Sequence, residues 1–245
     1  MGMLHAPVLH HRVTCSHGHP PPSLAELWER LQGYFKVRAY PGWFVHWPQI
    51  EVQAKALRWF ELVAVPGLLQ TEDYARAMLS TQVMAASRLA RQAVLAREHP
   101  PMLWVLLDEG VLWRPAGDAG VMAAQVGRLL AAARLPNAVI QVIPWSAGAH
   151  QGMSGNFVIA DLPDGTQVVY QDTAARGQIV EDSDDIRSVV LVWDTLKSEA
   201  LPRTASLALM EEAARSWTRA ASSGASRATA PATAEPALRL APPPA

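Results

Sequence analysis

Apolar residues recur at helical spacing in the first part of the chain, and the pattern predicts two helices there. Ser23 can cap the first, with Glu26 in capping-box position, and its apolar stripe comprises Leu24, Leu27, Trp28 and Leu31. Pro48 suits the first turn of the second helix. This helix is predicted to run to the stop signal Val65-Pro66-Gly67, with apolar positions Ile50, Ala54, Leu57, Trp59 and Phe60.

Two further helices are predicted before residue 101. Thr71 can cap one of them, because Glu72 and Asp73 follow in the first turn, where the helix dipole favours acidic side chains. The other is predicted over Leu89–Glu98, and the following pair of prolines ends it.

The pattern then changes to that of strands. Met102–Leu107 is an apolar run of strand length, and Val139–Ile143 is rich in β-branched residues. Phe157–Ala160 and Gln167–Tyr170 flank Pro163-Asp164-Gly165, which is typical of a hairpin.

Helices alternate with these strands. We predict helices over Asp118–Arg134 and Asp184–Glu199, and a last one from Thr204 or Ser206 to about Trp217. The whole order indicates an α+β fold, in which a small mixed or antiparallel sheet of about four strands packs with several helices and the N-terminal part is helical.

Composition divides the chain into three parts. Residues 1–22 are rich in His and Pro and are interpreted as an irregular leader. Residues 23–219 are expected to form the α+β domain. Residues 220–245 consist mainly of Ala, Ser, Thr and Pro, so they bury too little apolar surface to offset their ordering entropy and are predicted to be disordered.

Charge and cysteine content exclude some classes of function and some cellular locations. The formal net charge of the 245 residues is −1 and no long basic run occurs, which argues against direct nucleic-acid binding. The single cysteine, Cys15, excludes an intramolecular disulfide and fits a reducing compartment. Neither a signal peptide nor an apolar run of roughly 18 residues occurs, so we expect a cytoplasmic protein without a membrane span.

Motifs of catalysis are missing from the sequence. It has no glycine-rich phosphate loop, nucleophile elbow or helical zinc-binding histidine pair, so we predict no cofactor. The segment His10–His19 carries imidazole and thiol groups that suit zinc or nickel, but we interpret it as part of the leader and predict no metal site. The Gly-rich segment 146–155 contains His150 and joins two predicted strands, as loops that rim a pocket do.

Seven segments occur in a characteristic order along the chain: Val65–Ala77, Arg88–Leu95, Asp108–Arg114, Met122–Val126, Pro136–Pro144, Gly148–Phe157 and Val168–Tyr170. This series resembles the C-terminal domain of actinobacterial WhiJ-like, antitoxin-like transcriptional regulators, and the resemblance covers about Trp28 to Trp217. The Pro-Gly-Leu-Leu-Gln-Thr sequence at residues 66–71 is the most specific of them.

This resemblance implies a regulatory role. In that family a helix-turn-helix domain reads DNA, a small acidic partner protein is often encoded nearby, and the C-terminal domain is thought to sense that partner or a small molecule. Only some 22 residues precede the first predicted helix here, whereas a helix-turn-helix needs roughly 50 or more. Whether such a domain was lost or lies upstream of a misassigned start stays open.

Three hypotheses follow, in this order. The first is a regulatory module that binds a small acidic partner protein or a small-molecule effector. The second is a homodimeric interaction subunit that uses the Trp-rich stretch Tyr40–Trp47, because aromatic residues concentrate in interfaces. The third is an enzyme of secondary metabolism that uses His150, Glu109 and Tyr170. The candidate ligand- or partner-binding residues are Trp43, Trp47, Gln70, Tyr74, Arg76, Glu109, Trp145, His150 and Tyr170.

Overall fold

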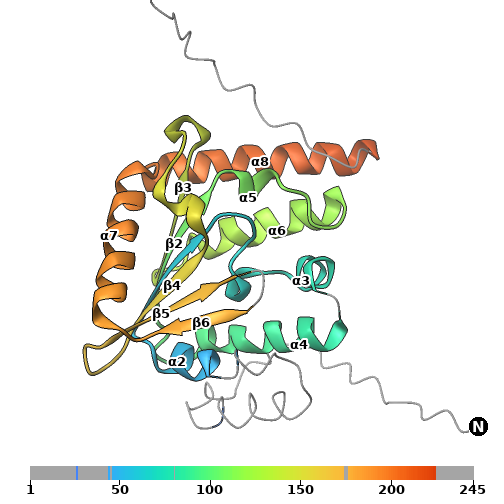
Figure 1. Cartoon of the computed structure of the whole chain (residues 1–245). Coiled ribbons are helices and arrows are strands. Elements are labelled where there is room, and N and C mark those ends of the chain that lie inside the picture. The colour runs from blue at the N-terminus through green and yellow to red at the C-terminus, as the bar shows by residue number, and fades with distance from the viewer. Residues whose placement is uncertain (1–25, 27–43, 45, 80, 174–175, 225–245) are drawn as a thin grey trace, which may run out of the picture.

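A single mixed β-sheet organises the computed structural model, which describes Glu26, Phe44 and residues 46–79, 81–173 and 176–224 (Figure 1). The sheet has six strands in the order β3-β2-β1-β4-β5-β6. The predicted α+β class is therefore confirmed. The leader 1–22, the capping residue Ser23, Trp43 and the end of the chain beyond residue 224 lie outside the described residues.

The direction of the strands changes in the middle of the sheet. β1 (Ala56–Glu61), β2 (Met102–Asp108) and β3 (Ala138–Ile143) run parallel to one another. β4 (Phe157–Asp161), β5 (Gln167–Asp172) and β6 (Gly177–Val180) form an antiparallel unit. β4 also pairs antiparallel with β1, so the chain crosses from β3 to the other side of β1.

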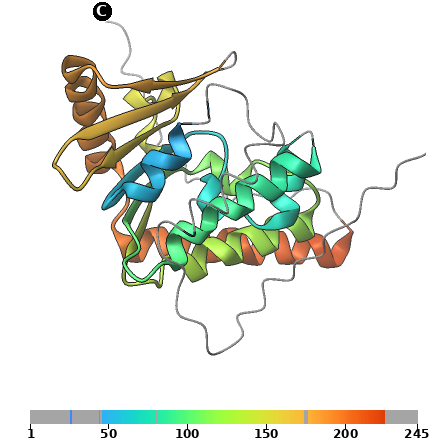
Figure 2. The ribbon, with the colours of Figure 1, turned by 90° about the horizontal axis from the view of Figure 1, so that it is seen from below.

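Helices cover both faces of this sheet (Figures 1 and 2). α6 (Ala119–Ala132) and α8 (Arg203–Ser223) pack on each other and on β3, and the short α5 (Gly110–Trp113) packs on β2 and α8. α7 (Ser183–Glu199) packs on the opposite face against β3 and β5. Because successive strand side chains alternate between faces, Trp59 joins the core beneath α6 and α8, whereas Phe60 joins the core beneath α7.

The connection from β1 to β2 builds a third helical group. It contains the 3-10 turn η2 (Gly67–Leu69), α3 (Glu72–Met78), α4 (Gln82–Arg91) and the 3-10 segment η3 (Gln92–Ala96). Thr71 and Thr81 cap α3 and α4 by accepting hydrogen bonds from Tyr74 N–H and Met84 N–H. α3 and α4 pack on each other, and α3 also contacts α6.

The long helix predicted from Pro48 to residue 65 is wrong. α2 (Trp47–Gln53) does begin at this proline, but it ends at Gln53 and the chain continues as β1. The apolar positions of this segment fit the period of a helix as well as that of a strand, and pairing with distant strands decides for the strand. As a central strand between β2 and β4, β1 buries Trp59 on one face and Phe60 on the other, so adjacent apolar residues are both satisfied.

The expected number of strands, about four, is also wrong. The four predicted strands all form, and β1 and β6 add to them. β6 is short and begins with Gly177, so local propensity gives it little strand character. Its pairing with β5 along Val169–Asp172 supplies the backbone hydrogen bonds that make it a strand.

Three helix boundaries differ from the expectation. α4 begins at Gln82, seven residues before the predicted Leu89, because Thr81 is its cap. The predicted end at Glu98 falls beyond η3, which continues the turn with tighter geometry. α8 runs to Ser223 and ends at Gly224, whose left-handed φ of 70° favours glycine, so the residues from 220 to 223 are helical rather than disordered. None of the helices in the described part of the chain is long and apolar enough to cross a membrane.

Candidate functional site

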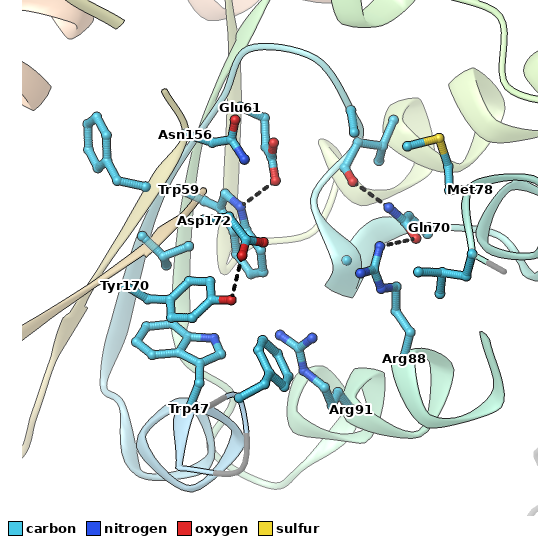
Figure 3. A pocket seen from close by; sticks show the side chains of 17 residues that line it. Trp47, Trp59, Glu61, Gln70, Met78, Arg88, Arg91, Asn156, Tyr170 and Asp172 are labelled. Carbon is cyan, nitrogen blue, oxygen red and sulfur yellow. Dashed lines mark hydrogen bonds between the residues drawn. The ribbon is translucent and has the colours of Figure 1, made fainter. Parts of the chain in front are cut away.

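A cavity of about 280 Å³ opens at the carboxyl end of β1 (Figure 3). It lies where β1 is parallel to β2 on one side and antiparallel to β4 on the other. Open α/β sheets bind ligands in the crevice at such a change in strand order. The lining residues with aromatic or polar side chains include Phe44, Trp47, Trp59, Glu61, Gln70, Arg88, Arg91, Asn156, Tyr170 and Asp172.

One wall of the cavity comes from the sheet. Trp59 and Glu61 lie two residues apart on β1, so they share a face, and Trp59 Nε1–H donates to Glu61 Oε1 at 2.9 Å. Tyr170 and Asp172 have the same spacing on β5, and the Tyr170 hydroxyl donates to Asp172 Oδ1 at 2.9 Å. Figure 3 shows all four side chains on the same side of the cavity.

Glu61 is the most unusual group in this wall. The residue is only 8 % exposed, and no ion pair among the described residues includes it. Burial raises its pKa from 4.5 to about 8, against the opposing effects of the Trp59 hydrogen bond and the charge of Arg88, while Asp172 raises it further. Glu61 therefore holds a proton in most molecules at neutral pH.

The neighbouring Tyr170 also keeps its proton. Burial raises the pKa of its hydroxyl above the ordinary value of 10.0, and the charge of Asp172 and the hydrogen bond to it add to this effect. Asp172 itself is exposed, at the mouth of the cavity. The sheet wall thus presents a deep, protonated carboxyl group, a neutral phenol and an exposed carboxyl group.

The opposite wall is formed by α4. Arg91 donates through Nε and Nη2 to both carboxylate oxygens of Glu51, at 2.8 and 2.6 Å. Both side chains are nearly fully buried. The guanidinium carbon of Arg91 also lies 4.8 Å from the centroid of the Phe44 ring, a cation–π contact. A bidentate ion pair therefore fixes this wall in place.

A side-chain network fixes the loop after β1. Gln70 Nε2 donates to the Val65 carbonyl oxygen at 2.7 Å, and Gln70 Oε1 accepts from Arg88 Nη1 at 3.2 Å. Gln92 Nε2 donates to the Gln70 carbonyl oxygen at 2.6 Å, and the Tyr74 hydroxyl accepts from Val65 N–H at 3.2 Å. The Pro-Gly-Leu-Leu-Gln-Thr segment is thus a structural edge of the cavity.

Aromatic rings line the end of the cavity next to α2. Trp47 stacks on Tyr170 with a centroid distance of 5.0 Å and an interplanar angle of 29°. Phe44 meets the same Tyr170 ring edge-on at 5.6 Å. Offset stacking and edge contacts of this kind are favourable arrangements of aromatic rings, so Phe44, Trp47 and Tyr170 support one another at this end of the cavity.

The predicted site residues fall into several environments. Trp47, Gln70 and Tyr170 line the cavity, and Tyr74 is buried just behind it. Arg76 is exposed on α3, where it pairs with Glu72. Trp145 is 41 % exposed in a 3-10 turn, and Trp43 lies outside the described residues.

The three residues of the enzyme hypothesis do not come together. His150 packs edge-on against Phe60, in the core beneath α7, and its Nε2 lies 3.2 Å from Asp108 Oδ2. Glu109 Oε2 accepts from Trp145 N–H at 2.9 Å, which ties the ends of β2 and β3 together. Tyr170 belongs to the core on the opposite face of the sheet. Over the described residues, moreover, no three His, Cys, Asp or Glu side chains gather as metal ligands.

Sequence reasoning missed the acidic and basic residues of the cavity, above all Glu61, Asp172, Arg88 and Arg91. The alternation Trp59-Phe60-Glu61 is the pattern that points Glu61 and Trp59 to one side, provided that the segment is read as a strand. Asp172 follows Tyr170 at the same spacing, just beyond the predicted end of its strand. Arg88 and Arg91 lie on α4, and their approach to β1 depends on the tertiary fold.

Comparison with protein families matches residues 46–212 to the family described as Domain of unknown function (DUF5753). The matched region begins at α2 and ends within α8, so it contains every strand of the sheet and all of the cavity wall contributed by α4 and β5. No curated protein and no solved structure matches the chain.

Proposed function

We propose that this chain, which belongs to the DUF5753 family, is the cytoplasmic effector-binding domain of a WhiJ-like transcriptional regulator. Its ligand is a small molecule that occupies the cavity at the end of β1. The single observation that supports this proposal is the cavity itself, which combines mutually packed aromatic rings with a few ionisable groups at the change in strand order.

The construction of the cavity favours a ligand over a packing defect. Voids left by imperfect packing are small and apolar, whereas this one is lined by Glu61, Gln70, Arg88 and Asp172. Its volume of about 280 Å³ lies near the lower end of small-molecule sites, which are roughly 300–1,000 Å³. We therefore expect a metabolite-sized ligand rather than a peptide segment.

Residues of the cavity wall also connect the ligand site to helices on the protein surface, so ligand binding can be communicated there. Arg88 reaches the cavity from α4, whose partner α3 exposes Glu72 and Arg76. The Gln70 network joins Arg88 to the loop after β1. A ligand that binds one arrangement of this network more tightly than another shifts the population of α3–α4 conformations, which a partner protein can read.

Ligand-observed NMR against a library of small polar aromatic fragments tests the proposal. We compare the wild type with Ala64→Leu, which adds three carbon atoms at the lining of the cavity, and with Leu191→Ala on the exposed face of α7 as the control. The wild type and the control should bind the same fragments, and Ala64→Leu should lose at least about tenfold in affinity for them.

Competition between fragments provides a second readout that does not depend on a variant. Fragments that share the cavity should displace one another, and their affinity should follow the same order in the wild type and in Leu191→Ala. The proposal is refuted if no fragment binds, or if Ala64→Leu is folded and binds every fragment as the wild type does.

A further inference from the structure

We propose that the ligand of this cavity is a small organic cation, an ammonium or guanidinium group on an apolar or aromatic body, and that Glu61 and Asp172 bind its charge. This inference rests on the proposed function and names the chemical class of the ligand. Three features of the described residues carry it: a buried carboxyl group that forms no ion pair among them, a second, exposed carboxyl group, and aromatic rings in the same lining.

The first feature is the contrast between Glu51 and Glu61. Both are buried, at 1 % and 8 % exposure. Glu51 receives a bidentate arginine, which is the usual way in which a protein compensates a buried carboxylate. Glu61 takes part in no ion pair of the described residues and accepts a hydrogen bond from Trp59. A cationic ligand would supply the partner that Glu61 lacks.

The second feature is the position of Asp172. It lines the same cavity from β5 but is exposed, so it lies where a ligand enters. The Tyr170 hydroxyl occupies one lone pair of Asp172 Oδ1, and a carboxylate offers about four acceptor positions. The two carboxyl groups therefore form a path of increasing burial, along which a cation is attracted at the mouth and desolvated at Glu61.

The third feature is the aromatic lining. Trp47, Trp59 and Tyr170 contribute rings to the cavity, and an organic cation is attracted to such rings more strongly when water is excluded. The cavity already contains one example of this contact, the Arg91 guanidinium over Phe44. A hydrated metal ion gains little from these rings, which favours an organic cation.

The charges that face Glu61 support a cation rather than an anion. Arg88 approaches from α4 and is hydrogen-bonded to Gln70, Asp172 approaches from β5, and the hydroxyl of Tyr74 lies behind it on α3. An anion placed near Arg88 or Arg91 would face the Asp172 carboxylate, and the charge of Arg91 is already balanced by Glu51. A cation placed against β1 has the two carboxyl groups beside it and Arg88 on the far wall, as Figure 3 shows.

Binding of a cation must ionise Glu61, which has a consequence for pH dependence. The free protein holds a proton on this carboxyl group up to about pH 8, because burial raises its pKa. The complex requires the carboxylate, so one proton leaves on binding below that pH. The affinity should therefore rise by up to about tenfold per pH unit below pH 8 and level off above it.

The test uses two probes of nearly the same shape, benzylguanidine and benzylurea. The first keeps its positive charge across the whole range because a guanidinium group has a pKa above about 12, and the second is neutral. We titrate each into the full chain by isothermal calorimetry from pH 6 to 9. Benzylguanidine should bind at least tenfold more tightly at pH 8 than benzylurea, and its affinity should rise with pH as stated.

Two variants locate the charge. Glu61→Gln keeps an acceptor for the Trp59 N–H, and it should lower the affinity for benzylguanidine by roughly tenfold or more at pH 8 and remove its pH dependence. Asp172→Asn should cause a smaller loss, because that group is exposed. Glu211→Gln on the exposed side of α8 is the control and should bind as the wild type does.

The outcomes separate this inference from the proposed function. If benzylurea or other neutral fragments occupy the cavity as tightly as the cation, or if the affinity for the cation falls as the pH rises, the cavity is a ligand site but the cationic class is refuted. If neither probe binds while other, neutral fragments do, the cavity is again a ligand site and the cationic class is again refuted. If nothing binds in the cavity at all, both the inference and the proposed function fail.

Discussion

Glu61→Gln should stabilise the protein, and the gain should grow as the pH rises. The pKa of Glu61 is raised by burial from 4.5 to about 8, so the folded state binds its proton more tightly than the unfolded chain does. Below pH 4.5 both states are protonated and burial of this group costs little. Between pH 4.5 and 8 the unfolded chain ionises while the folded state does not, so the wild type loses stability; above pH 8 the loss is complete.

The expected gain is on the order of 3 kcal/mol at pH 7, since each pKa unit corresponds to about 1.4 kcal/mol. Glutamine resembles the protonated acid and can still accept the Trp59 hydrogen bond, so no other contact need change. Urea unfolding followed by circular dichroism at several pH values between 4 and 9 measures the difference between the variant and the wild type.

The exposed Glu72 on α3 provides the control for this measurement. Its substitution by glutamine should give a small difference in the free energy of unfolding that varies little with pH, because the group is solvated. A Glu61→Gln curve that runs parallel to the wild-type curve over the whole range would show that Glu61 ionises normally in the folded protein. The account of the sheet wall would then be incorrect.

The second large effect is expected at the other wall of the cavity. Glu51→Gln should lower the free energy of unfolding by about 3–5 kcal/mol, because it leaves the buried guanidinium of Arg91 without its bidentate partner. Arg91 lines the cavity, so ligand binding should weaken together with stability. Urea unfolding at pH 7 measures the first effect, and titration with a cavity ligand measures the second.

An ion pair on the protein surface serves as a control that shows whether burial causes the stability loss expected for Glu51→Gln. Glu72 and Arg76 form an ion pair on exposed α3, and Glu72→Gln should cost only about 0.3–0.5 kcal/mol. The combined variant Glu51→Gln/Arg91→Met removes both buried charges and should recover much of the loss. A cost below about 1 kcal/mol for Glu51→Gln would mean that water reaches this pair and that the wall is open.

Local sequence signals predicted the fold wherever short-range chemistry decides the structure. Asp118 was expected at the start of a helix and caps α6 by accepting from Val121 N–H. The Pro163-Asp164-Gly165 turn was expected between two strands, and Gly165 adopts a left-handed φ of 88° there. These elements depend on a few adjacent residues, so a single sequence contains the information.

The strand β1, which was predicted as part of a helix, shows the limit of what local sequence signals determine. Residues 56–61 carry apolar side chains that fit a helix as well as a strand, and their strand pairing partners lie about 45 and 100 residues further along the chain. No local feature specifies those partners. The position of β1 at the centre of the sheet is therefore a tertiary property that overrides local propensity.

The same limit explains the partial prediction of the site. Trp47, Gln70 and Tyr170 were among the expected binding residues, and they line the cavity. Glu61 was not predicted as a site residue because the helix predicted from Pro48 to residue 65 includes it, and in a helix residues two apart such as Trp59 and Glu61 do not face each other. His150 and Glu109 are polar residues near strand ends, yet His150 packs on the opposite face of the sheet from the cavity, and both residues hydrogen-bond to neighbouring loops.

The central claim, that the cavity at the end of β1 is the ligand site, is tested most directly by the tryptophan indole signals in a ¹H–¹⁵N NMR spectrum. Trp47 and Trp59 line the cavity, whereas Trp193 belongs to α7 and packs in the core on the opposite face of the sheet, and Trp217 belongs to α8 and donates to the Leu112 carbonyl oxygen. Assignments follow from single Trp→Phe variants. Addition of benzylguanidine, or of the tightest-binding fragment, should shift the signals of Trp47 and Trp59 and leave those of Trp193 and Trp217 in place. Shifts at Trp193 or Trp217 with unchanged signals from Trp47 and Trp59 would contradict the account.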